Sequence, residues 1–117
     1  MAAFQTTIDG SIHILSVSGR LDPHGGKDLK DTMSALVDGE EKGDLLVDLE
    51  QLEYMASAGF RELFLAGRKL GRKGGRLVVC SLRGEVKRVF ELARFDTAYP
   101  IFETQAEALA HLKAPQA

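Results

Sequence analysis

Residues 45–64 read LLVDLEQLEYMASAGFRELF, and this stretch decides the fold. Its first five residues are nearly all apolar, as is typical of a strand that is covered on both faces of a sheet. Further along, Phe60, Leu63 and Phe64 recur at the spacing of one helical face. A buried strand that leads into an amphipathic helix is the unit from which parallel α/β sheets are built.

The segments before this stretch begin the same alternation. Phe4 to Ile8 and Ile12 to Val17 predict a β-hairpin, and Asp9-Gly10 between them favours a two-residue turn. Asp22 suits the N-cap of a helix and Pro23 suits its first position. The apolar residues that follow at helical spacing are Leu29, Met33, Leu36 and Val37.

The segments after it continue the pattern. Residues 77–80 predict another buried strand, residues 86–93 a third helix, and residues 99–102 a short strand at a sheet edge. Thr104 and Glu107 stand at capping-box spacing and open a last helix, with Ala106, Leu109 and Ala110 facing inward. The predicted order, ββαβαβαβα, implies a single α/β domain with four helices packed against a mixed five-stranded sheet.

Length and composition fit an ordinary globular protein. The chain has 117 residues, of which 44% are hydrophobic and 27% charged, with a net charge of −2. We expect one domain over residues 1–113 and a disordered tail over residues 114–117. The charge argues against a dedicated nucleic-acid binder. No segment has the length of a membrane span or the pattern of a signal peptide, so a cytoplasmic location is expected.

Signatures of catalysis are missing from the sequence. The phosphate-loop pattern is absent, and the glycines of residues 67–75 fall at other spacings. His13, His24 and His111 fall on separate predicted elements, so no metal site and no cofactor are expected. Cys80 lies in a predicted buried strand, where cysteine acts as a small hydrophobic residue. The basic residues 68–76 lack interleaved aromatic residues and are interpreted as a solvated helix end. The chain is therefore predicted not to be an enzyme.

Ser57 allows two interpretations. A serine between a loop and an amphipathic helix is a good N-cap. The same place, at the positive end of a helix, suits an anion, and a phosphate there would add a charge of about −1.5 to −2. Ala56, Ala58 and Gly59 are small and leave the hydroxyl accessible. The two roles are compatible.

Three stretches carry a resemblance to a known family. They are VSGRLDPHGGKDLKDTM (17–33), the central stretch 45–64, and GGRLVVCSLRGEVKRVFELARFD (74–96). Together they resemble STAS domains, and more narrowly the bacterial anti-anti-sigma factors, also called anti-sigma factor antagonists. The resemblance covers almost the whole chain and implies the same fold order. It also implies a signalling protein that controls transcription by partner switching.

In that family the central loop reads Asp-Ser-Ser/Thr-Gly-Leu, and the serine after the aspartate is phosphorylated. By position this phospho-acceptor is Ser57. The resemblance implies two partners: an anti-sigma factor that is also an ATP-dependent serine kinase, and a metal-dependent serine phosphatase. The implied partner-binding surface consists of Leu21, Asp22, Pro23, His24, Met55, Ala56, Ala58, Gly59, Phe60 and Arg61.

The sequence departs from this pattern next to Ser57. Ala56 stands where the family has aspartate, Ala58 where it has serine or threonine, and Phe60 where it has leucine. Two alternatives therefore stay open. One is a STAS scaffold or docking module that is not phosphorylated, and the other is a STAS domain that senses a small molecule or nucleotide.

Overall fold

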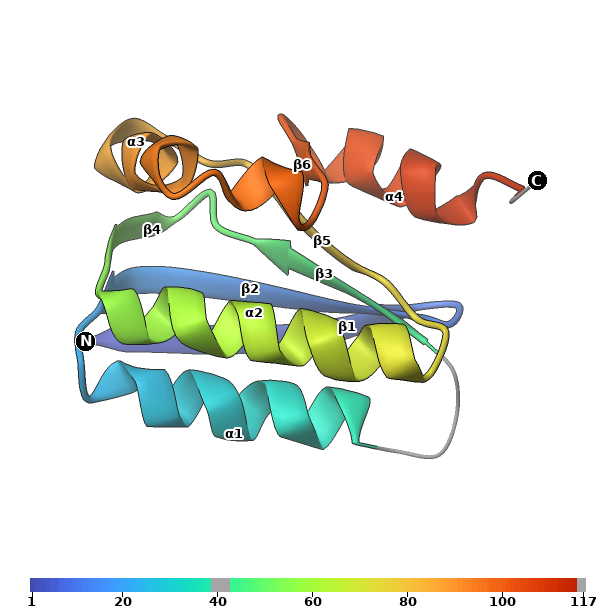
Figure 1. The fold of residues 1–117 in the computed structure, drawn as a ribbon, viewed down its shortest axis with the longest axis horizontal. Helices are drawn as coiled ribbons and strands as arrows, with labels where there is room; N and C mark the ends of the chain where they lie inside the picture. The colour runs from blue at the N-terminus through green and yellow to red at the C-terminus, as the bar shows by residue number, and fades with distance from the viewer. Residues whose placement is uncertain (39–42, 116–117) are drawn as a thin grey trace.

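The elements follow from a computed structural model that describes residues 1–38 and 43–115. Residues 116 and 117, the end of the predicted tail, lie outside this range. In chain order the elements are β1 (Ala2–Asp9), β2 (Ile12–Leu21), α1 (Gly25–Val37), β3 (Asp44–Asp48), β4 (Leu52–Met55), α2 (Ser57–Arg72), β5 (Leu77–Cys80), α3 (Gly84–Leu92), the 3-10 helix η1 (Phe95–Thr97), β6 (Ile101–Phe102) and α4 (Gln105–Lys113). Figure 1 shows their arrangement.

The strands form one mixed sheet in the order β1-β2-β3-β5-β6. The hairpin partners β1 and β2 are antiparallel, and the other pairs are parallel. β4 pairs with the end of β2, beyond the part of β2 that pairs with β3. The predicted α/β fold, mixed sheet and four α-helices are thus confirmed over the described residues. The sheet has six strands there rather than five, because the segment expected to be a loop contains β4.

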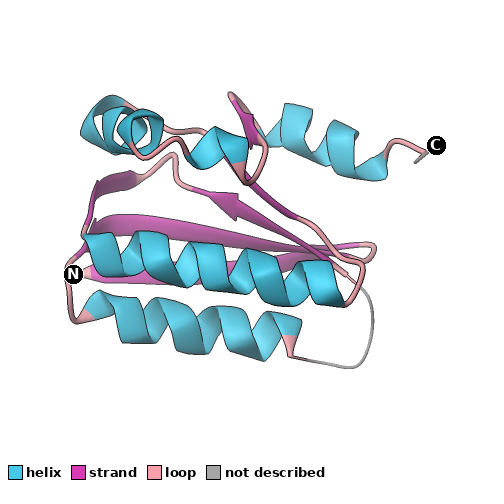
Figure 2. Ribbon diagram, in the orientation of Figure 1, coloured by secondary structure: helices cyan, strands magenta, loops and turns pink. Residues whose placement is uncertain are grey.

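Helices cover both faces of the sheet (Figure 2). α1 and α2 lie side by side on one face, and they enclose the main core with Leu15, Val17 and Leu21 of β2. α4 covers the other face, where Ala108 and Leu112 pack with residues of β2, β3 and β5. The two layers hold the carboxyl ends of β2 and β4 in place, and the candidate site begins there.

A chain of aromatic rings attaches α3 and η1 to the main core. Phe60 of α2 lies 4.6 Å from Phe90 of α3, between ring centroids, and Phe90 lies 4.9 Å from Phe95 of η1. Phe95 is in turn 4.9 Å from Phe64 of α2. Such contacts contribute about 0.5–1.5 kcal/mol each beyond the area they bury. The beginning of α2 is therefore packed against α3.

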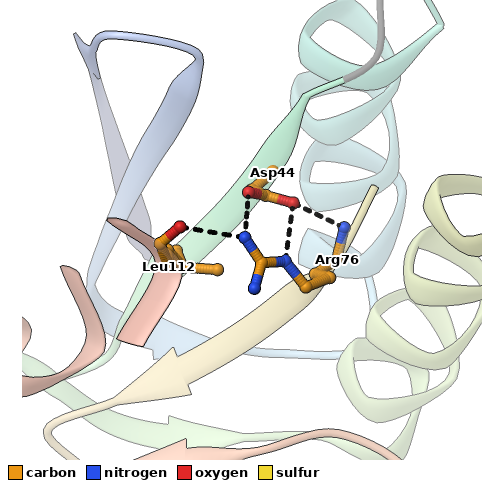
Figure 3. A network of polar contacts seen from close by, with 3 residues as sticks. All are labelled: Asp44, Arg76 and Leu112. Carbon is orange, nitrogen blue, oxygen red and sulfur yellow. Dashed lines mark hydrogen bonds and ion pairs between the residues drawn. The ribbon is translucent and has the colours of Figure 1, made fainter. Parts of the chain in front are cut away.

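A polar cluster ties the start of β3 to β5 and α4 (Figure 3). The guanidinium of Arg76 donates to Asp44 Oδ1 and Oδ2 at 3.3 and 3.0 Å, and the Arg76 backbone N–H donates to Oδ1 at 2.8 Å. The same guanidinium donates to the Leu112 carbonyl at 2.9 Å. Both side chains are largely shielded from water, so this cluster fixes the end of α4 against the sheet.

The opening hairpin differs from its prediction by one residue. Asp9 pairs with Ile12, so the turn consists of Gly10 and Ser11 rather than Asp9 and Gly10. Gly10 adopts a positive φ of 63°, which is the reason a glycine suits the turn.

The last helix faces the core with residues other than those predicted. Thr104 is confirmed as the N-cap of α4, because the Glu107 N–H donates to the Thr104 hydroxyl at 3.1 Å. Ala108 and Leu112 are buried, whereas Ala106 and Ala110 are exposed and Leu109 is half-buried. The prediction of Ala106 and Ala110 as inward residues was wrong. Alanines recur at every second position here, so their pattern alone does not select a helical face.

Candidate functional site

Ser57 is the first residue of α2, and its side chain is exposed. The N-cap is Ala56, whose backbone is extended with φ −72° and ψ 160°. The predicted N-cap role of Ser57 was therefore wrong. The Ala56 N–H donates to the Leu21 carbonyl at 2.8 Å, which continues the pairing of β4 with β2 through residue 56. The helix therefore begins at Ser57, one residue earlier than the predicted N-cap would allow, and the Ser57 hydroxyl is not used to cap it.

Small residues bring the first turns of α1 and α2 into contact. A Cβ atom added to Gly26 would lie 2.9 Å from the Ala58 Cβ, so a side chain at 26 would meet Ala58 directly. A Cβ on Gly59 would lie 2.7 Å from both Leu21 Cδ2 and Met55 Cγ. Both helices begin at the same end of the molecule, next to the carboxyl ends of β2 and β4 (Figure 1). The site is therefore closely packed around Ser57.

The turn before α1 supplies a second part of the site. Asp22 Oδ1 accepts from the Gly25 N–H at 2.9 Å. The N-cap of α1 is nevertheless His24, so the predicted N-cap role of Asp22 and the predicted first helical position of Pro23 were wrong. The regular helix begins at Gly25, and Pro23 and His24 form an irregular turn in front of it. Asp22, Pro23 and His24 are all exposed.

The implied partner-binding residues divide into two groups. Asp22, Pro23, His24 and Arg61 are exposed, and Ala58 is half-buried. The other five are buried: Leu21, Met55, Ala56, Gly59 and Phe60. Leu21 is fully buried, and Phe60 is part of the aromatic chain with Phe90. The buried group packs beneath the exposed residues of the surface.

Arg20 and Tyr54 belong to the same surface and were missed by the sequence analysis. They are paired neighbours on β2 and β4, and the Arg20 guanidinium carbon lies 4.7 Å from the centre of the Tyr54 ring. Tyr54 is 40% exposed. Tyrosine and arginine are enriched among residues that dominate protein interfaces. A sequence signal for this pair exists only once β4 is recognised as a strand.

Two of the acidic residues before Ser57 are occupied elsewhere. Asp48 accepts from the Glu50 N–H and from Gln105 Nε2, both at 2.9 Å. Glu50 lies 3.8 Å from an Arg83 nitrogen in an exposed ion pair. Asp48 therefore stabilises the turn after β3 and the start of α4.

Cys80 is fully buried, and burial raises the pKa of its thiol to about 12, so it remains protonated at neutral pH. Within residues 1–38 and 43–115, no group of three or more His, Cys, Asp and Glu side chains could hold a metal ion. No helix in that part of the chain is long and apolar enough to span a bilayer. A cavity of about 750 Å³ lies between α3 and β6, and none of the predicted site residues lines it.

Comparison with known proteins gives the family. The sequence profile of the STAS domain matches residues 3–108. The chain is 32% identical over 106 residues to the candidate anti-sigma factor antagonist BtrV of Bordetella bronchiseptica, covering 91% of this chain and 90% of that protein.

Solved structures agree with that assignment. An anti-sigma factor antagonist from Mycobacterium paratuberculosis superposes with a TM-score of 0.87 at 25% identity, over 97% of this chain and 96% of the other. SpoIIAA, a cell fate determinant of Bacillus solved in a phosphorylated form, superposes with a TM-score of 0.75 at 20% identity, over 95% and 100%. At that identity the likeness to SpoIIAA shows the fold alone. On the profile match and the relationship to BtrV, this chain belongs to the STAS domain family and to its anti-sigma factor antagonists.

Proposed function

We propose that this protein binds a serine-kinase anti-sigma factor in a partner-switching system, and that phosphorylation of Ser57 weakens the complex. The observation that carries the proposal is the position of Ser57. It is exposed at the first residue of α2, and its hydroxyl makes no capping bond. A kinase can reach it without unfolding the helix. The known phosphorylated form of SpoIIAA, which shares the fold, supports the same kind of modification here.

The docking surface consists of exposed residues around Ser57: Arg20, Asp22, Pro23, His24, Tyr54 and Arg61. The buried residues beneath them hold their backbone in one conformation. Little of the chain therefore has to become ordered when a partner binds. Low ordering cost favours affinity. A phosphate on Ser57 adds bulk and a charge of about −1.5 to −2 in the middle of this surface. Switches of this kind typically change affinity through a coupling of about 1–3 kcal/mol.

The proposal implies a cycle with two partner proteins. The anti-sigma factor uses ATP to phosphorylate Ser57, and a metal-dependent serine phosphatase removes the phosphate. The protein itself needs no cofactor and makes no direct contact with nucleic acid in this scheme. The cycle would operate in the cytoplasm.

Binding measurements with the partner kinase test the proposal. Wild type and Ser57→Ala should bind the anti-sigma factor, and Ser57→Asp should bind it several-fold to a hundred-fold more weakly. Ser11→Asp is a matched control, because Ser11 is also exposed but lies in the β1–β2 turn. This turn is near the C-terminal end of α2, whereas Ser57 is at the N-terminal end (Figure 1). Equal binding by all four proteins would refute the switch.

A second candidate is a docking module that is never phosphorylated. It is favoured by Ala56, which is buried, and Ala58, which packs towards Gly26, because neither places a polar side chain next to Ser57. Intact-mass measurement after incubation with the kinase and ATP separates the two candidates. A single phosphate that is lost in Ser57→Ala supports the switch, and an unchanged mass supports the docking module.

A further inference from the structure

Arg61 is placed to interact with any group attached to Ser57. It follows Ser57 by four residues on α2, and it is exposed. Residues at this spacing have Cβ atoms about 5–6 Å apart on one helical face. Helical side chains also lean toward the N-terminus, so Arg61 covers the turn that contains Ser57. Within residues 1–38 and 43–115, Arg61 forms no ion pair, so its charge is available.

No other side chain on the first turn of α2 can take that role. Ala56 and Ala58 flank Ser57 without polar groups, and the first turn carries no acidic residue that would compete for Arg61. The next cations along α2 are Arg68 and Lys69, about two turns further on. Lys69 is already paired with Asp38, at 3.5 Å.

We infer that Arg61 is the counter-charge that binds the phosphate of phosphorylated Ser57. This inference rests on the proposed function, and it specifies how the switch works. The planar guanidinium donates to two phosphate oxygens, a geometry that arginine favours. The phosphate lies against the first turn of α2, where the helix dipole also stabilises negative charge. Phosphorylation therefore removes a cation from the docking surface at the same time as it adds an anion.

The test places phosphoserine at position 57 during synthesis, by genetic encoding, and follows its second ionisation by ³¹P NMR. We expect the second pKa of the phosphate to rise by about 0.2–0.4 when Arg61→Gln is introduced, because the dianion loses one neighbouring charge. Arg61→Lys should restore part of the difference. The matched control is Arg68→Gln, which removes the same charge about two turns away and should leave the pKa unchanged.

The comparison between variants keeps the surroundings constant. The charged and titratable groups from the neighbouring elements include Arg20 of β2, Asp22 and His24 of the turn before α1, and Glu53 and Tyr54 of β4. Lys27 and Asp28 of the first turn of α1 also remain unchanged. These groups are the same in every variant, so their effects cancel in the difference.

Two results would overturn the inference. One is an identical phosphate pKa in wild type and Arg61→Gln. The other is a pKa shift in Arg68→Gln equal to that in Arg61→Gln, which would show that the phosphate responds only to the net charge of the helix. Because the phosphate is installed without the kinase, these results are independent of whether the partner phosphorylates Ser57. Failure of the kinase reaction would refute the proposed function, and failure of the titration would refute the role of Arg61.

Discussion

Gly26 and Ala58 provide the sharpest test of how the site is packed. The perturbation is Gly26→Ala in the first turn of α1. Alanine is favoured over glycine inside a helix by up to about 1 kcal/mol, so helix propensity alone predicts stabilisation. The added Cβ would lie 2.9 Å from the Ala58 Cβ, whereas unstrained carbon atoms are about 3.5–4.0 Å apart. Both Cβ atoms are bonded directly to the backbone and cannot rotate away, so relief requires a movement of α1 against α2.

The steric cost of the Cβ–Cβ contact exceeds the gain in helix propensity. Overpacking of this kind costs about 1–3 kcal/mol, so we expect a net loss of about 1 kcal/mol in the free energy of unfolding. The effect should reverse when the opposing atom is removed. In an Ala58→Gly background, Gly26→Ala meets no Cβ and should stabilise the protein by about 0.5–1 kcal/mol. The coupling between the two positions is then about 2 kcal/mol, within the range for residues in contact.

Urea denaturation of the four proteins measures this cycle. The midpoints should change while the slope stays the same, because the same surface is exposed on unfolding. Stabilisation by Gly26→Ala in the wild-type background, or a coupling below about 0.5 kcal/mol, would refute the close approach of the two helices. The same result would contradict the supporting role of Gly26 and Ala58 beneath the docking surface.

Three further predictions concern stability. Arg76→Ala removes three hydrogen bonds and leaves the Asp44 carboxylate poorly paired, so it should cost about 2 kcal/mol in urea denaturation, whereas a change below about 0.5 kcal/mol would show that water replaces the guanidinium. Burial raises the pKa of Cys80 from 9.0 to about 12. The contribution of the buried, protonated thiol to the free energy of unfolding is therefore fully present below pH 9 and is lost as the pH rises toward 12. Wild type should therefore lose stability relative to Cys80→Ala between pH 9 and about 10.5, and parallel pH profiles would contradict this. Tyr99→Phe removes the hydrogen bond from the Tyr99 hydroxyl to the Phe64 carbonyl, 2.8 Å long, and should lower the free energy of unfolding by about 0.5–1 kcal/mol; an unchanged midpoint would contradict it.

Hydrophobic periodicity was sufficient for most of the fold. The strand at residues 77–80 is buried along its whole length, and Leu29, Met33 and Val37 of α1 face the core. β4 escaped prediction because its buried residues, Leu52 and Met55, are three positions apart, whereas an alternating strand buries every second residue. β4 exists because its backbone pairs with β2, where the register shifts between Gly19 and Arg20. Such tertiary pairing leaves no local pattern in the sequence.

The candidate site was predictable in part for the same reason. Ser57 was found because a serine before an amphipathic helix is a recognisable pattern, and the resemblance to STAS domains placed a phospho-acceptor there. Its N-cap role was wrong because residue 56 is held by a hydrogen bond to Leu21, a contact between distant segments. The sequence also could not separate exposed from buried members of the loop. Met55 and Phe60 turn inward, and Tyr54 and Arg61 turn outward.

That separation determines how a switch at this site can work. Beneath Ser57, Leu21 and Met55 are buried and lie against Gly59, where an added Cβ would be 2.7 Å from each of them. A modification of the exposed hydroxyl therefore has little capacity to rearrange the loop, since displacing these side chains would require overpacking at Gly59. Under the proposed switch, a phosphate on Ser57 would act through the charge and shape of the surface itself. Arg61 is the exposed cation on the same helical face, so the change in surface charge is concentrated at the start of α2, where the partner would dock.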